Sequence, residues 1–234
     1  MKQFRLTLFT WVALLVLPGV LQAHGIGSSD QHLLSEGGLL AYVYVGAKHM
    51  VTGYDHLLFL VGVIFYLSNF RDIIRFITVF TVGHSITLLG ATYLGIMADE
   101  HLVDGLIAVS VLYKGFENLG GFEKVFGAKS PNLFWMVFLF GLIHGFGLSA
   151  RLQSFTMGME QFFAKIVCFN VGVELGQVLA LIPIVFVIEK WRGKRGYATF
   201  YTVTNWGLIV AGIALLIYQI YAHYQQIWHE QGLS

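Results

Sequence analysis

The sequence predicts an all-α fold: a polytopic membrane bundle of six transmembrane helices, preceded by a signal peptide that is expected to be cleaved. The first observation behind this prediction is composition. Hydrophobic residues make up 56% of the 234 residues, charged residues make up 12%, and the mean hydropathy is +0.70. Soluble domains of this length are far less apolar. The second observation is that long apolar runs recur from residue 39 onward.

The charge balance argues against a nucleic-acid partner. The formal net charge is +1, and the basic residues form no continuous stripe that would bind a phosphate backbone. Cys168 is the only cysteine, so an internal disulfide is excluded, and its apolar neighbours indicate an inert buried thiol. With its apolar composition, the chain is expected to lie in the lipid bilayer.

Residues 1–23 have the layout of a secretory signal peptide. Lys2 and Arg5 precede a mostly apolar run, which ends at Ala23 before a polar segment. Leu21 is bulky for the position three residues before the cleavage point, so an uncleaved first span stays open as an alternative. After cleavage, His24 would be the amino terminus. Its amine and imidazole could chelate a metal ion, although the position of this histidine can also be incidental.

A short exported segment, residues 24–38, is polar and rich in glycine and serine, and it is expected to lack a core of its own. The six-helix domain follows over residues 39–222, and residues 223–234 form an exported tail. Each crossing needs about 20 apolar residues. The expected spans are 39–67, 73–96, 102–120, 132–150, 161–189 and 200–222.

The distribution of positive charge predicts the orientation in the membrane. Alternate loops hold most of the lysine and arginine, and the strongest of them is the loop that contains Lys190, Arg192, Lys194 and Arg195. Cytoplasmic loops carry an excess of these residues. The chain is therefore expected in the plasma (inner) membrane with both mature termini outside.

The first span contains potential metal ligands near its middle. His49, Gly53 and His56 are spaced at i, i+4 and i+7, so one helix face would hold both imidazoles, with Asp55 beside them. On a continuous helix the two histidines lie about 10.5 Å apart, at about 1.5 Å per residue. That distance is too long for one ion. Either the helix breaks at Gly53, or His49 passes an ion on to Asp55 and His56; we expect the second arrangement.

The later spans contain few polar residues, and these are of the kinds that bind metals. The second span contains His84, the fourth contains His144, and the fifth has Asn170, Glu174 and Gln177 at i, i+4 and i+7. A single buried histidine often serves only an interhelical hydrogen bond. Several of them together with carboxylates favour a functional site, because polar groups inside a membrane are costly.

The third span contains Asp104, Lys114 and Glu117. Lys114 and Glu117 are three residues apart and can neutralise each other, which would make them structural. Glu117 is alternatively a candidate for the inner end of an ion pathway, as Asp104 is for its outer end. Glycines beside the polar positions are expected to allow close helix packing; these are Gly83, Gly90, Gly141, Gly145, Gly172 and Gly176.

The segment from His49 to His56 resembles the His-x-x-x-Gly-x-Asp-His signature of the HupE/UreJ family of hydrogenase and urease accessory membrane proteins. Its second, less characterised branch is similar to this chain in four further motifs: Leu57-Leu-Phe-Leu60, Phe80-Thr-Val-Gly-His-Ser-Ile-Thr-Leu88, Phe140-Gly-Leu-Ile-His-Gly-Phe-Gly147 and Phe169-Asn-Val-Gly-Val-Glu-Leu-Gly-Gln177. The resemblance implies a membrane protein associated with nickel uptake. It also implies metalloenzyme maturation proteins as partners.

Two mechanisms are consistent with these residues. In the first, the chain is a permease for a divalent transition metal such as nickel, cobalt, zinc or iron, which imidazole and carboxylate ligands bind well. In the second, the same cluster is a permanent site of an intramembrane metalloenzyme, or the chain is a metal-centre assembly factor. Transport is the favoured hypothesis, and no catalytic residue is assigned. The expected metal ligands are His49, Asp55, His56, His84, His144 and Glu174. The expected supporting or pathway residues are His24, Asp104, Glu117, Asn170 and Gln177.

Overall fold

The computed structural model describes residues 27–65, 67, 69–153, 161–230 and 232, and these residues form helices and connecting loops without a strand. The predicted signal peptide and His24 lie outside the described residues. The α-helices are α2 (Ser28–Glu36), α3 (Gly38–Thr52), α4 (Tyr54–Ile64), α5 (Phe70–Leu94), α6 (Glu100–Asn118), α7 (Leu133–Gln153), α8 (Phe162–Trp191) and α9 (Tyr197–Glu230). A short π-helix, η1 (Phe122–Phe126), lies between α6 and α7.

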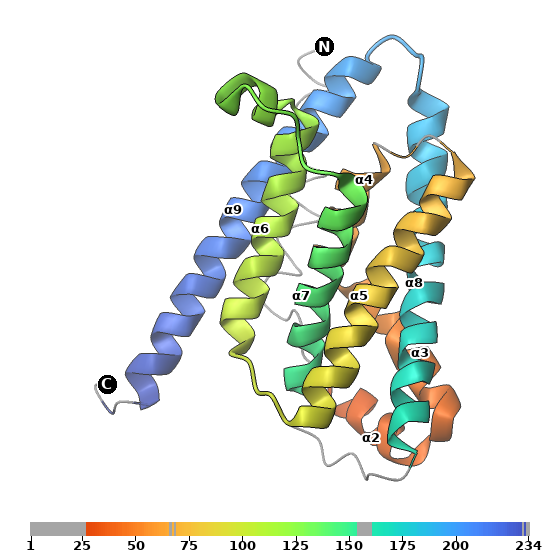
Figure 1. Cartoon of the computed structure of the whole chain (residues 1–234), viewed down its shortest axis with the longest axis vertical. Coiled ribbons are helices and arrows are strands. Elements are labelled where there is room, and N and C mark those ends of the chain that lie inside the picture. The colour runs from red at the N-terminus through yellow and green to blue at the C-terminus, as the bar shows by residue number, and fades with distance from the viewer. Residues whose placement is uncertain (1–26, 66, 68, 154–160, 231, 233–234) are drawn as a thin grey trace.

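The long helices form one bundle and alternate in direction along the chain (Figure 1). The helices α5, α7 and α9 run one way, and α6 and α8 run the other way. The helix α3, followed by α4, runs in the same direction as α8. The loops after α4, α6 and α8 therefore lie at one end of the bundle, and the loop after α5 lies at the other end with α2.

Four helices are long and apolar enough to cross a membrane, by length and composition: Arg71–Leu94, Leu133–Gln153, Phe162–Trp191 and Tyr197–Trp228. The chain is therefore a helical membrane protein, as its composition predicts. The helix α6 falls outside this set because Asp104, Lys114 and Glu117 raise its charge. The helices α3 and α4 fall outside it because each is short.

Close helix packing depends on glycine in three helix pairs. A Cβ atom at Gly141 of α7 would overlap the carbonyl oxygen of Phe80 of α5, and one at Gly172 of α8 would overlap that of Val43 of α3. At Gly115 of α6, a Cβ atom would lie 2.7 Å from a carbonyl oxygen of α9. The pairs α5–α7 and α3–α8 are parallel and α6–α9 is antiparallel (Figure 1). Gly90 was also expected to allow close packing, but it differs from Gly141 and Gly172, because a Cβ atom there meets nothing within 4 Å.

The expected continuous first span is broken. The helix α3 ends at Thr52 and α4 begins at Tyr54, and Gly53 between them is extended, with φ −70° and ψ 101°. The backbone N–H of Gly53 still donates to the carbonyl oxygen of His49 at 2.9 Å. The assumption of an unbroken helix, on which the separation of His49 and His56 was calculated, is therefore wrong.

The segment predicted to be exported, residues 24–38, contains the helix α2 (Ser28–Glu36). The helix α2 packs on α3, and its Leu34 is buried. The ammonium group of Lys48 lies 2.7 Å from a carboxylate oxygen of Asp30. This ion pair ties α2 to α3 a few residues before the break.

Candidate metal centre

The break at Gly53 places the first turn of α4 inside the bundle. A Cβ atom at Gly53 would lie 2.6 Å from Nδ1 of His56 and 3.1 Å from Oδ1 of Asp55. Only glycine therefore fits while these two side chains keep their positions. The first turn of a helix also favours a negative side chain, because the free N–H groups and the helix dipole are positive there. The first turn of α4 is therefore a favourable position for the carboxyl group of Asp55.

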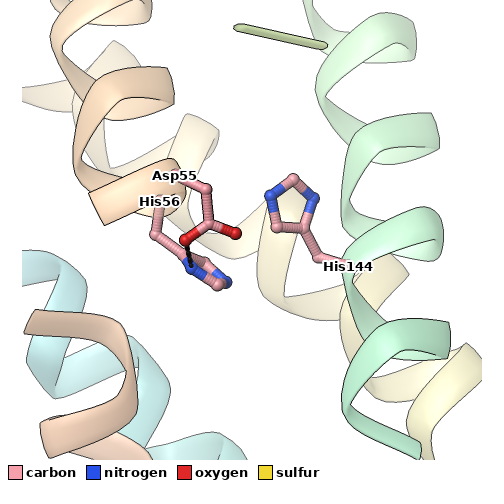
Figure 2. A group of neighbouring side chains, drawn as sticks. All are labelled: Asp55, His56 and His144. Atoms are coloured by element: carbon pink, nitrogen blue, oxygen red, sulfur yellow. Dashed lines mark hydrogen bonds and ion pairs between the residues drawn. The ribbon is translucent and has the colours of Figure 1, made fainter. Parts of the chain in front are cut away.

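Three buried side chains converge at this point: Asp55 and His56 from α4 and His144 from α7. Figure 2 shows Asp55 and His56 facing the imidazole of His144 across the space between the two helices. One ligand atom from each residue lies within 4.8 Å of the other two. A metal–nitrogen bond is about 2.0–2.1 Å long, so modest side-chain rotations would bring all three atoms onto one ion.

Hydrogen bonds set the tautomer of His144. Its Nδ1 lies 2.7 Å from the carbonyl oxygen of Phe140. A carbonyl oxygen only accepts, so Nδ1 carries the hydrogen and Nε2 of the neutral ring keeps its lone pair. This Nε2 atom is buried and has no hydrogen-bond partner among the described residues. It is available as a metal ligand.

A hydrogen bond sets the tautomer of His56 in the same way. Its Nδ1 lies 2.9 Å from Oδ1 of Asp55 (Figure 2). When Nδ1 donates to this carboxylate, Nε2 is left as the ligand atom. A carboxylate that holds the far nitrogen of a metal-binding imidazole fixes the orientation of the ring and raises its basicity.

His84 is held beside this group by α8. Its Nδ1 lies 2.8 Å from Oδ1 of Asn170, and the amide nitrogen of Asn170 donates to the carbonyl oxygen of Ile166 at 3.1 Å. The ring of Phe80 contacts both His84 and His144, with centroid distances of 6.2 Å and 5.1 Å. His84 is therefore adjacent to the three-residue group without belonging to it.

His49 contacts His56 across the break at Gly53. The ring centroids of the two histidines are 5.0 Å apart in an edge-on contact. The ring of His56 in turn lies 4.8 Å from that of His144. His49 is thus next to the group, on its α3 side, although it is not one of the three converging residues.

The polar residues of α8 divide between the interior and the surface. Gln177 is fully buried and accepts a hydrogen bond from the hydroxyl of Thr81 at 3.2 Å. Glu174 instead lines a surface groove between α5 and α8, together with Thr78 and Ser85. The structure therefore places Glu174 away from the group of Asp55, His56 and His144.

The pathway candidates on α6 are both engaged in ion pairs. Glu117 pairs with Lys114, and both side chains are almost completely buried. Asp104 accepts hydrogen bonds from Nη2 of Arg151 at 2.8 Å and from Nε2 of Gln219 at 3.3 Å. The expected spans 132–150 and 161–189 leave Arg151 in a loop, and Gln219 was not among the expected site residues. The requirement that a charge inside the membrane has a partner was the available signal for Arg151.

Phenylalanine rings enclose the group on the side of α5 and α7. Phe59 lies 5.3 Å from Phe140 and 6.0 Å from His144, measured between ring centroids. Phe59 and Phe80 are each 1% exposed. Such surroundings exclude water, which strengthens electrostatic attraction between an ion and its ligands.

The comparisons with known proteins agree with the motifs around these residues. The model of the family described as "HupE / UreJ protein" matches residues 29–226. The matched region runs from α2 into α9 and contains every residue of the group described above. No curated protein and no solved structure matches the chain. The family model covers most of the sequence, and the chain therefore belongs to the HupE/UreJ family.

Proposed function

We propose that this protein binds a divalent transition-metal ion at Asp55, His56 and His144 and transports it across the membrane. The observation that carries the proposal is the convergence of these three buried side chains, with ligand atoms within 4.8 Å of one another. Membership of the HupE/UreJ family supports a role in metal uptake or as an accessory protein. Nickel and cobalt are the leading candidates for the ion, since imidazole and carboxylate ligands bind first-row metals.

The proposed ligand set suits transport because it is small. Two imidazoles and one carboxylate leave positions open on the ion for water or for further ligands, such as His49 or His84. A cage of thiolates would hold the ion too firmly for release. A mixed nitrogen and oxygen set allows the ion to bind and leave.

In this proposal the chain crosses the membrane six times, with α3 and α4 together forming the first crossing and α6 forming the third. The loops rich in lysine and arginine lie in the cytoplasm, and the mature termini lie outside the inner membrane. The metal group, formed by Asp55, His56 and His144, lies at the break between α3 and α4. Many transporters bind their ions at a discontinuous helix, where the end of a half-helix contributes its dipole.

The membrane potential is sufficient to drive inward transport. Each positive charge that moves inward through 100 mV releases about 2.3 kcal/mol, so a divalent cation releases about 4.6 kcal/mol. At equilibrium, this free energy corresponds to an ion concentration inside that is more than about a thousandfold higher than the concentration outside. The proposal therefore requires no second coupling ion.

Purified protein in proteoliposomes tests the function. A metal-sensitive dye enclosed in the vesicles should report Ni²⁺ or Co²⁺ entry when the inside is made negative, and His144→Ala should abolish this entry. His32→Ala is the matched control, because the His32 side chain is 72% exposed on α2. A tightly held ion that survives chelator washing, without any flux into vesicles, would instead indicate an enzyme with a resident metal.

A further inference from the structure

A buried ion pair lies beside the metal group, toward the end of the bundle that holds the loop after α5. Asp104 of α6 is 7% exposed, and Nη2 of Arg151 of α7 lies 2.8 Å from its Oδ2 atom. Gln219 of α9 donates to the same oxygen at 3.3 Å. The Oε1 atom of Gln219 lies 2.8 Å from Nδ1 of His101, which fixes the orientation of the amide. Three helices thus meet at one carboxylate.

This carboxylate and Asp55 share a cavity. The cavity is lined by Tyr54, Asp55, Asp104 and Gln219, with apolar walls from Ile107, Ala108 and Leu215. Its volume is about 10 Å³, which is room for about one water molecule. Asp104 is therefore the next carboxylate outward from the metal group.

Arg151 connects Asp104 to the surface. Its Nε atom lies 3.4 Å from a carboxylate oxygen of Glu100, whose side chain is 49% exposed, while the Arg151 side chain is 8% exposed. Glu100, Asp104 and Asp55 thus lead from the surface to the metal group, with one guanidinium among them. A guanidinium is always charged. Arg151 therefore places a permanent cation on the route that an arriving cation would follow.

We propose that Asp104 is a transient outer subsite for the divalent cation, and that Arg151 occupies this subsite as a tethered cation until the ion arrives. The ion displaces the guanidinium, which then pairs with Glu100. Asp104 and Asp55 face one cavity and together carry two negative charges, so they match a divalent cation better than the single charge of Arg151 does. The proposal rests on the proposed function, since it assigns the outer access route to that metal group.

A purely structural ion pair predicts different behaviour. Buried ion pairs contribute little net stability, and removing one partner leaves an uncompensated charge that destabilises the fold. A structural pair would therefore change the melting temperature and leave the kinetics of metal binding unchanged. Displacement of the guanidinium would contribute to the energy barrier that the ion crosses both on binding and on release. Removal of the guanidinium should therefore change both rate constants by the same factor and leave the affinity of the final site unchanged.

The test is stopped-flow binding of Co²⁺ to the full chain in detergent, followed by cobalt absorbance. We expect Arg151→Gln to raise both the association and the dissociation rate constants about tenfold, with the dissociation constant unchanged within about twofold. Asp104→Asn should lower the association rate. Arg192→Gln is the control, because Arg192 lies at the opposite end of the bundle, where α8 ends, and pairs there with Glu189 of α8.

A second variant covers the case in which Arg151→Gln does not fold. Glu100→Gln removes the alternative partner of Arg151 at a half-exposed position, and it should slow both rate constants several-fold. If the wild-type protein binds Co²⁺ and neither variant changes the rates, the outer subsite is refuted while the metal group stands. If the wild-type protein binds no Co²⁺ or Ni²⁺, the proposed function itself fails.

Discussion

The imidazole rings of His56 and His144 lie 4.8 Å apart between centroids, although they belong to α4 and α7. Two features bring them together. The break at Gly53 turns the start of α4 into the bundle, and Gly141 lets α7 pack directly on the backbone of α5. The Nδ1 atom of His56 is hydrogen-bonded to the carboxylate of Asp55, and the Nδ1 atom of His144 is hydrogen-bonded to the carbonyl oxygen of Phe140.

Gly53→Ala should weaken metal binding without unfolding the protein. Alanine accepts the backbone angles at Gly53, which lie in the extended region. Its methyl group would lie 2.6 Å from Nδ1 of His56 and would displace the ring. We expect the affinity for Ni²⁺ to fall about 10- to 100-fold, measured by titration calorimetry. Gly90→Ala is the control, since a Cβ atom there meets nothing, and an equal loss in both variants would contradict the steric argument.

Asn170→Leu should weaken metal binding through His84. The variant removes the oxygen that lies 2.8 Å from Nδ1 of His84, so the ring loses its fixed tautomer and orientation. We expect an affinity loss of up to about tenfold, smaller than the loss in His56→Ala. Val171→Ala is the control, because Val171 is 46% exposed on the same helix. An unchanged affinity in Asn170→Leu would show that His84 is only structural.

The histidines should act as a unit. If His56, His84 and His144 serve one ion, each single alanine variant should lose most metal-dependent transport, and double variants should be little worse than the single ones. Vesicle flux and a detergent melting curve are measured together. Additive losses that follow the melting temperature would indicate three separate structural histidines.

The buried pair of Lys114 and Glu117 allows a test of the inner pathway. Removal of one partner from a buried pair costs about 3–5 kcal/mol, whereas replacement of both by apolar residues is often neutral. Lys114→Met alone should therefore lower the melting temperature markedly, and Lys114→Met with Glu117→Met should restore it. Transport that survives in the double variant assigns the pair a structural role. Transport that is lost in a well-folded double variant places Glu117 on the pathway.

The loop between α8 and α9 should face the cytoplasm. Lys194→Cys in a Cys168→Ser background introduces one thiol at an exposed position of this loop. Gly193 is less suitable for the substitution, because its φ of +81° disfavours any side chain. An impermeant thiol reagent added to intact cells should spare Lys194→Cys and label Met97→Cys in the loop after α5. The opposite pattern would reverse the proposed orientation.

The sequence predicted the helices better than it predicted the contacts between them. The expected span 73–96 corresponds to α5 (Phe70–Leu94), and 161–189 corresponds to α8 (Phe162–Trp191). Long apolar runs indicate such helices without any tertiary information. The break at Gly53 could not be located in the same way, because a glycine within an apolar segment is compatible with either a straight or a broken helix.

For the candidate site too, individual residues could be predicted from the sequence, whereas their partners on other helices could not. Asp55, His56 and His144 were identifiable because each is polar within an apolar segment. The partners that orient or neutralise such residues come from other helices, as Asn170 does for His84 and Arg151 does for Asp104. These pairs depend on which helices lie next to each other, and a single sequence does not give that information. Glu174 was expected as a metal ligand because it shares a helical stripe with Asn170. Its side chain instead lines the groove between α5 and α8.

The most direct test of the shared metal site is X-ray absorption spectroscopy of the Co²⁺-loaded protein, in the wild type and in His144→Ala. Scattering from imidazole rings counts the histidine ligands of the ion. The proposed site predicts at least two imidazoles together with oxygen ligands in the wild type, and one imidazole fewer in His144→Ala. An identical imidazole count in the two proteins would contradict the assignment of Asp55, His56 and His144 to one ion.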